Sequence, residues 1–280
     1  MSPMSPMSPM SRPMRLLLWA MVLIAATTAR AQSWQIGVGP TRLLDTYLSQ
    51  EHFEGTGLTL LSSHEYTHRP DCHQCANRFA RLDSLPPRRW TTIVENQLHL
   101  SSADDRAGNE SIIEGDYHVY AGRYRRWFLL YGRLQLQAGA LGALGMGFIY
   151  DMRNGNNPAN ARLSLQLMPS AIATWHFQLC RQMFQLRWRG DMTLCGLAFS
   201  PRYGQSYYEM FQLGKYDRNI VATTVASQPC FRQQLTLAWR MSRRCHLTVG
   251  LLGDYQQLSV NHLRQHVYSE RFMIGIVTNR

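Results

Sequence analysis

The sequence has 280 residues and a formal net charge of +11 at pH 7. The basic residues are nearly all arginines spread singly along the chain, and Lys215 is the only lysine. They form no clustered face or tail of the kind that binds nucleic acid, so nucleic acid is excluded as a partner. Six cysteines in a chain of this length do not make a small disulfide scaffold.

The N-terminal segment has the composition of an export signal. Residues 1–10 repeat the triplet Met-Ser-Pro and cannot form a core. Behind them Met14 and Arg15 precede the apolar stretch 16–26, and Ala29 to Ala31 fits a small-x-small cleavage site. We therefore predict a low-complexity start plus signal peptide over 1–31, cleaved near Ala31–Gln32, and a single domain over 32–280. No later segment reaches the roughly 18 apolar residues that a transmembrane helix needs.

Hydrophobic alternation and turn signals predict about ten strands after the signal peptide. They are expected near 33–45, 57–68, 90–102, 111–122, 128–150, 160–179, 183–199, 219–240, 245–257 and 267–279. Tight connections at 123–126, 180–182 and 242–244 alternate with longer polar ones at 102–109, 151–160, 200–218 and 259–266. Short turns at one end and long loops at the other are typical of outer-membrane barrels, whose tight turns are periplasmic. We predict an all-β fold, an antiparallel transmembrane β-barrel of about ten strands.

The segment 129–177 carries the clearest pattern, two hydrophobic alternations on either side of one polar loop. In the first arm Leu136 and Leu144 share a parity, and Gln135 and Gln137 take the other. In the second arm Leu165 and its neighbours alternate with polar residues in the same way. Because a period of two places each parity on one face of a strand, we expect the apolar face to contact lipid and the polar face to line the lumen.

Charged residues elsewhere fall on the parity expected to face the lumen. A charge on the lipid face would cost about 2–4 kcal/mol at the midplane, so their shared parity is informative. A barrel of this size has a narrow lumen that side chains can fill, which favours a closed network of arginines and carboxylates over an open pore. The network is predicted to contain Glu95, Glu114, Asp116, Arg133, Arg162, Arg187, Arg189, Asp191 and Arg232.

Residues 68–89 interrupt the pattern with a connection far too long for a tight turn, which we interpret as a long periplasmic insert. His64 and His68 match the spacing of the H-E-x-x-H zinc motif, which requires a helix. On the strand expected here they would lie about 13 Å apart, so no metal site is predicted. Cys72 and Cys75 favour a local disulfide or an inert pair, with a metal loop as a minor alternative.

Serine and histidine residues of the predicted strands raise the alternative of a hydrolase. Ser164 or Ser170 could act with His176, and His118 could act with Asp116. These side chains share the lumen-facing parity, however, and no local signature singles any of them out. Hydrogen bonding inside the lumen is therefore the preferred interpretation, and no catalytic residue or cofactor is predicted.

Three stretches resemble a known family. They are GVGPTRLLDTYLS (37–49), GFIYDMRNGNNPANARLSLQ (147–166) and FSPRYGQSYYEMFQLG (199–214). Together they resemble the domain-of-unknown-function 3316 family of exported proteins of Gram-negative, gut-type bacteria. The resemblance implies a barrel-like β protein and brings no activity, cofactor or catalytic residue. Its most specific residues lie in the predicted outer loops and are candidates for shaping those loops or facing a ligand: Asn156, Asn157, Pro158, Tyr207, Tyr208 and Glu209.

The sequence thus predicts a location more firmly than an activity. We expect a protein of the cell outer membrane, with outer-membrane lipid and the barrel-assembly machinery as partners. Its leading role is structural, or the binding of a small solute or lipid through its extracellular loops. An outer-membrane hydrolase acting on lipid or peptide at the barrel rim and a soluble periplasmic β-barrel remain as alternatives.

Overall fold

The computed structural model describes residues 32–67, 90–153, 158–179, 181–214, 219–242 and 245–278. The predicted signal peptide (1–31) and the predicted insert (68–89) lie outside the described residues. None of the helices in the described ranges is long and apolar enough to cross a membrane.

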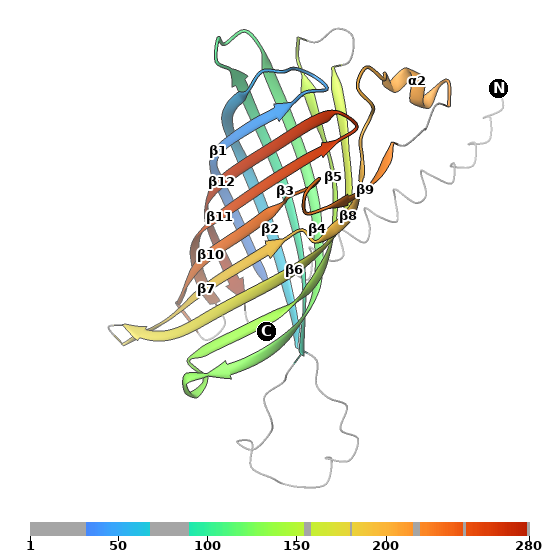
Figure 1. Ribbon diagram of the computed structural model, residues 1–280. Coiled ribbons are helices and arrows are strands. Elements are labelled where there is room, and N and C mark those ends of the chain that lie inside the picture. The colour runs from blue at the N-terminus through green and yellow to red at the C-terminus, as the bar shows by residue number, and fades with distance from the viewer. Residues whose placement is uncertain are drawn as a thin grey trace, which may run out of the picture.

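Twelve antiparallel strands build one barrel (Figure 1). They are β1 (Ser33–Asp45), β2 (Phe53–Thr67), β3 (Trp90–Asp105), β4 (Ser111–Leu129), β5 (Leu134–Asp151), β6 (Ala159–Leu179), β7 (Gln182–Met192), β8 (Cys195–Phe199), β9 (Ile220–Thr224), β10 (Phe231–Arg240), β11 (Cys245–Val260) and β12 (Leu263–Thr278). Strand β1 pairs with both β2 and β12, and β5 pairs with β6, so the sheet closes on itself.

The wall has ten strand positions, as the sequence predicted, because two positions are each shared by two strands. Strands β7 and β8 both pair with β6: Asp191 pairs with Ser170, and Cys195 pairs with Leu167. Three residues lie between Asp191 and Cys195, whereas only two residues of β6 lie between Leu167 and Ser170, so the β7–β8 side has one extra residue. This bulge lies opposite Pro169, which has no N–H to give to the ladder. Strands β9 and β10 share the next position and are separated by residues 225–230.

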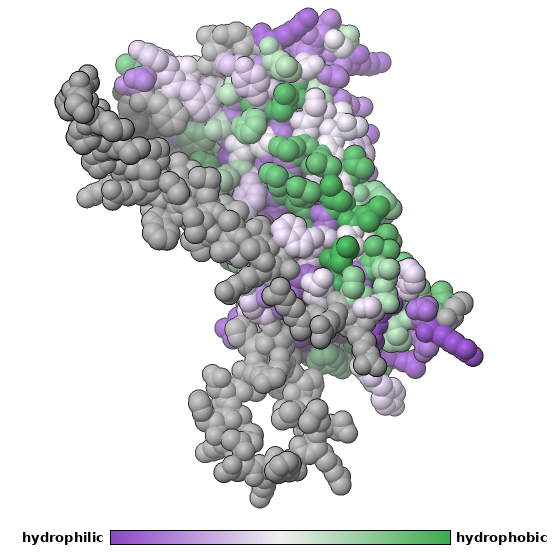
Figure 2. Space-filling model, turned by 180° about the vertical axis from the view of Figure 1, so that it is seen from behind, coloured by the Kyte–Doolittle hydropathy of each residue, from purple (hydrophilic) through white to green (hydrophobic). Residues whose placement is uncertain are grey.

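The alternation in 129–177 predicted the facing of the side chains correctly. Gln135 and Gln137 are buried inside the barrel, whereas Leu144 and Leu165 are exposed on its outer surface. Exposed large apolar side chains occur on the outer face of nearly every strand, and in Figure 2 they form a band with hydrophilic residues above and below it.

The expected turn at 123–126 is wrong. Strand β4 continues to Leu129, and the chain reverses in the short 3-10 helix η2 (Leu130–Gly132), where Leu130, Tyr131 and Gly132 all have positive φ. The arginines of the expected turn instead alternate across the strand. Arg123 lies over the ring of Trp90, 5.1 Å from its centroid, and forms part of the outer surface.

One end of the outer surface carries a ring of tryptophans. Five of them are exposed near the strand ends that lie beside the beginning of β1 and the end of β12: Trp34, Trp90, Trp127, Trp175 and Trp239. The same end carries the short connections after β4, β6 and β10, and the opposite end carries the helix α2 (Tyr207–Phe211). We call these the inner end and the outer end of the barrel. The longer connection expected at 259–266 is wrong, because the β11–β12 ladder continues to the pair Val260–Leu263 and leaves a two-residue turn at the outer end.

Candidate functional site

The middle of the lumen is closed by a layer of two arginines and two carboxylates, named here the central layer. Arg189 contacts Glu95 at 3.2 Å and Asp191 at 3.0 Å. Arg232 contacts Asp191 at 3.1 Å, makes its shortest contact with Glu95, and lies 4.7 Å above the ring centroid of Tyr120. All four charged side chains are almost completely buried. Their charges sum to zero, and each charge is paired and hydrogen-bonded, which is what burial of charge requires.

A second cluster lies nearer the outer end, around Arg162 of β6. Its guanidinium contacts Glu114 at 3.1 Å and Asp116 at 3.5 Å. It also donates to the side-chain carbonyl oxygens of Gln256 and Gln265, at 2.7 and 3.1 Å. The three nitrogens of one planar group thereby bind side chains from β4, β11 and β12, so Arg162 connects β6 to parts of the wall that are far apart in sequence.

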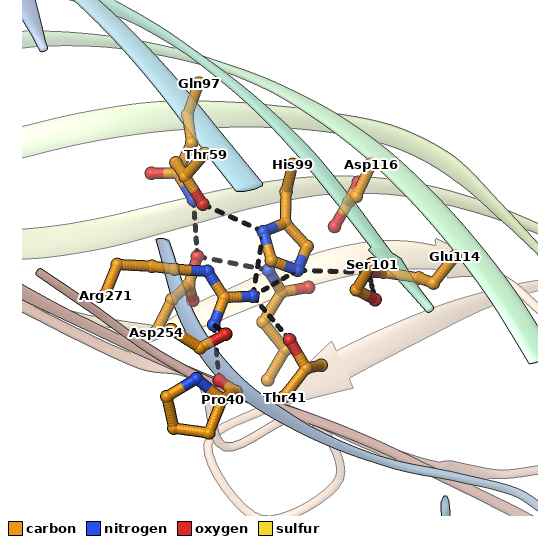
Figure 3. Close-up of polar contacts among 12 residues, drawn as sticks. Pro40, Thr41, Thr59, Gln97, His99, Ser101, Glu114, Asp116, Asp254 and Arg271 are labelled. Atoms are coloured by element: carbon orange, nitrogen blue, oxygen red, sulfur yellow. Dashed lines mark hydrogen bonds and ion pairs between the residues drawn. The ribbon is translucent and has the colours of Figure 1, made fainter. Parts of the chain in front are cut away.

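Arg271 forms a third cluster, drawn in Figure 3, that the sequence analysis missed. Its guanidinium donates to the carbonyl oxygens of Gly39, at 2.8 Å, and Pro40, and to the hydroxyl of Thr41. Among the described residues it makes no ion pair with a carboxylate. It contacts the ring of His99, which contacts Glu114 at 3.1 Å. Arg271 therefore joins β12 to β1 where Pro40 interrupts their ladder, and the alternation along 267–279 was the signal that could have placed it inside.

The inner end of the lumen opens into a polar vestibule of about 130 Å³, with hydroxyl and amide side chains on its wall. Glu65 contacts Arg126 at 3.4 Å and Arg187 at 3.2 Å beside it. The vestibule ends at the central layer, since Glu95 and Arg189 line both.

An apolar cluster fills the lumen toward the outer end. Leu43, Phe53, Ile112 and Ile149 are buried against one another there, and Tyr47 packs on them from the β1–β2 connection. Together with the central layer, this cluster fills the lumen with side chains at two levels.

The structure brings eight of the nine predicted network residues together. They lie in the central layer, around Arg162, or beside Glu65. Arg133 lies elsewhere, exposed at the turn that precedes β5. The reason is the longer β4: because the chain reverses at Leu130–Gly132, Arg133 falls outside both strands and its parity has no meaning.

The predicted loop residues divide into anchors and exposed groups, and Asn156 and Asn157 lie outside the described residues. The hydroxyl of Tyr207 accepts from the backbone N–H of Ala161 at 2.6 Å and donates to Asn160 at 2.9 Å, at the start of β6. Burial raises the pKa of Tyr207 above its usual value. Tyr207 also packs edge-on against Tyr47, with ring centroids 5.9 Å apart. Tyr207 thus fastens α2 over the outer end.

The other described loop candidates, Tyr208, Glu209 and Pro158, differ from Tyr207 in their contacts. Tyr208 is exposed. Glu209 lies in the first turn of the helix, where its backbone N–H donates to the hydroxyl of Ser206, the N-cap, at 3.2 Å. Pro158 directly precedes β6 and is partly buried, and its carbonyl accepts from the N–H of Asp151 at 2.7 Å.

The serines and histidines considered for hydrolysis all lie on the lumen side. His118 contacts Asp116 at 2.8 Å inside the barrel. Ser170 accepts from the hydroxyl of Tyr124 at 3.0 Å and donates to Asp191 in the central layer. These contacts are those of a lumen network, and no serine–histidine–polar trio faces lipid among the described residues.

The metal motif of the sequence is not assembled by the part of the chain that the structure describes. His64 lies in β2, and His68, Cys72 and Cys75 fall outside the described residues. No group of three or more potential metal ligands occurs among the residues described. Cys195, Cys230 and Cys245 are free thiols.

Comparison with known proteins gives a family and several barrels. A family model described as "Protein of unknown function (DUF3316)" matches residues 24–280. No curated protein sequence matches the chain. The transport unit of the autotransporter AIDA-I from Escherichia coli is similar over 94% of this chain and 97% of its own, with 8% identity and a TM-score of 0.44. The β domain of the Bordetella autotransporter BrkA is similar over 89% and 98%, with 10% identity and a TM-score of 0.38.

Proposed function

We propose that this chain, which belongs to the DUF3316 family of proteins of unknown function, is an outer-membrane β-barrel with a sealed lumen. In this proposal the outer loops bind a small solute or lipid, and the barrel conducts nothing. The single observation that carries the proposal is the outer surface of the wall, where large apolar side chains are exposed on nearly every strand.

Such a surface is unfavourable in water. Each large apolar side chain left exposed forgoes roughly 1.5–3 kcal/mol of burial, and here they lie side by side around the barrel. Lipid removes that cost. The tryptophan ring at the inner end supports the same reading, since aromatic side chains gather where hydrocarbon meets water.

The sealed lumen supports a binding or structural role over transport. The central layer is neutral and fully paired, so an ion passing through would have to break buried ion pairs. The outer end carries the helix α2, whose Tyr208 is exposed and available to a ligand.

The orientation and the partners follow from the same features. We place the outer end outside the cell, because three of the short connections, those after β4, β6 and β10, lie at the other end, together with the first residue of β1 and the last residue of β12. Outer-membrane lipid is then the partner of the apolar belt, which is the band of exposed large apolar side chains on the outer face of the strands. The barrel-assembly machinery is the partner during insertion.

Two neighbouring residues of β10 offer a matched test of the membrane assignment. Leu235 is exposed on the outer face, and Gln234 lines the vestibule inside. We expect Leu235→Arg to lower the yield of folded barrel in outer-membrane fractions, read by heat-modifiable migration on a detergent gel, and Gln234→Arg to be tolerated better. The arginine on the lipid face should cost about 2–4 kcal/mol if it lies near the midplane. Equal effects of the two changes, or recovery of the wild-type protein in the soluble periplasmic fraction, would overturn the proposal.

A further inference from the structure

The outer rim above β11 and β12 contains a basic hollow with an open volume of about 820 Å³. Its main lining residues are Arg202, Tyr203, Asn261, His262, Leu263 and Arg264. We propose that this rim hollow binds the phosphate groups of an outer-leaflet glycolipid. The inference rests on the proposed outer-membrane location and adds the ligand class and the residues that bind it.

A tight turn builds one side of the hollow. Val260 pairs with Leu263, so only Asn261 and His262 connect the two strands, with φ of 53° and 63°. Positive φ at both central residues is what a type I′ hairpin turn requires, and asparagine tolerates it better than most residues. The turn therefore holds its two side chains at the tip of the hairpin in a fixed arrangement.

Asn261 also contacts the segment that forms the other side of the hollow. Its amide donates to the carbonyl oxygen of Ser200 at 3.1 Å and to that of Pro201 at 3.5 Å. These contacts fix the segment that carries Arg202 beside the hairpin. On β12 the backbone of Arg264 is fixed by Thr46, whose hydroxyl accepts from the Arg264 N–H at 2.8 Å. Two arginines from distant parts of the chain thus meet in one hollow on a fixed backbone.

The charges in the rim hollow are not neutralised within the described residues. Arg202 and Arg264 are exposed and form no ion pair there, and no carboxylate lines the hollow. Arg42, at the same end of the barrel, is different because it contacts Glu54 at 3.3 Å. Two guanidinium groups without carboxylate partners suit an anion that accepts several hydrogen bonds, and phosphate matches the planar fork of arginine.

The level of the hollow along the wall identifies the source of the phosphate. On the outer face of β12, Ile276, Ile274 and Phe272 are exposed in the apolar belt. Further along the strand Tyr268 stacks with His266, with centroids 5.7 Å apart, and Arg264 follows. Apolar residues, an aromatic level and then cations are the order in which a membrane protein meets hydrocarbon, interface and headgroups.

Glu270 is the one carboxylate on the outer face of β12, below the hollow. It accepts from the hydroxyl of Tyr255 at 3.0 Å and does not line the hollow. The charged residue of β12 that lines the hollow is thus the cation Arg264, which fits the phosphates of a lipid.

The test uses the full mature chain folded in detergent and lipid A as the probe, in its diphosphoryl form and after phosphatase treatment. Binding is measured by native mass spectrometry. We expect the diphosphoryl form to bind the wild type at least tenfold more tightly than the dephosphorylated form. We expect R202Q/R264Q to bind the two forms equally. The matched control is R106Q/R153Q, which removes the same charge from two exposed arginines in other outer connections that do not line the hollow.

Heat-modifiable migration of each variant is measured first, which separates this inference from the proposed function. A wild-type chain that does not fold as a membrane barrel refutes the proposed function. A folded wild type that binds both lipid forms equally refutes only the rim hollow. Equal loss in R106Q/R153Q would show a general charge effect, and full displacement by millimolar inorganic phosphate would show a free-phosphate site; either result overturns the proposal.

Discussion

Removing Arg232 should destabilise the barrel more than almost any other single change, because Arg232 neutralises the central layer. Its guanidinium is 2% exposed and contacts Glu95, Asp191 and the side-chain oxygen of Gln97. The variant Arg232→Met keeps much of the side-chain volume and removes the charge. It leaves two carboxylates facing one arginine among side chains that are almost completely buried.

The expected cost follows from that imbalance. Breaking a buried ion pair by removing one partner costs about 3–5 kcal/mol, because a charge remains buried and uncompensated. Glu95→Gln should cost a similar amount for the opposite reason, since it leaves an excess positive charge. The double variant E95Q/R232M restores neutrality with Arg189 and Asp191 still 3.0 Å apart. Its cost should therefore fall short of the sum of the two single costs by about 1–3 kcal/mol.

Equilibrium unfolding in urea, followed by tryptophan fluorescence in lipid vesicles, measures these three costs. Arg187→Met is the control, because Arg187 is partly exposed and shares Glu65 with Arg126. That change should cost about 1 kcal/mol or less. Additive costs in the double variant, or an Arg232→Met cost no larger than that of Arg187→Met, would refute a charge-balanced layer that seals the lumen.

Four further outcomes are expected. Tyr207→Phe should make the segment around α2 more sensitive to protease without changing global unfolding, because two hydrogen bonds worth about 1 kcal/mol each are lost locally. The raised pKa of Tyr207 favours the protonated hydroxyl in the folded state, so its stabilisation should be complete below about pH 10 and lost only as pH rises through the raised pKa; alkaline absorbance should show one late-titrating tyrosine fewer in Tyr207→Phe than in the wild type. Arg271→Met should loosen the β1–β12 seam and lower the temperature of heat-modifiable migration, since the carbonyls of Gly39 and Pro40 lose their donor. Elemental analysis should find no stoichiometric zinc, and one zinc per chain would contradict the prediction of no metal site at either His64 and His68 or Cys72 and Cys75.

Alternation along a strand carries the facing of side chains, and for that reason the wall was predictable. A period of two is a local property, so Leu165 and Gln166 could be assigned to opposite faces from their neighbours alone. The number of strand positions was predictable for the same reason. The residues at which the strands end were less predictable. The arginine-rich run at 123–126 has the composition of a turn, but Arg123 and Arg125 lie on the outer face beside Trp90 and Trp127.

The sequence could not predict which charged side chains pair within the lumen. The parity of a residue indicates the face of the strand on which it lies, and not its position along the barrel axis. Arg232 and Glu95 lie 137 positions apart in the sequence and meet only through the register of every strand pair between them. A shift of two residues in one pair would keep all faces and separate them. The predicted list was therefore a set of charges assigned to one face, and the structure distributes eight of the nine among the central layer, the surroundings of Arg162 and the Glu65 contacts.

The same reasoning explains why the outer end has to be fastened by specific contacts. In the proposed membrane location the apolar belt tolerates many sequences, since lipid contact demands only hydrophobicity. A segment above the belt has no such surface to bury, and it must be fixed by hydrogen bonds to strand ends that the register has already positioned. Tyr207 meets Ala161, and Asn261 meets Ser200, in this way. If the outer loops bind a ligand, these two anchors set the shape of the site, and the exposed residues beside them, Tyr208 and Arg202, make the contacts.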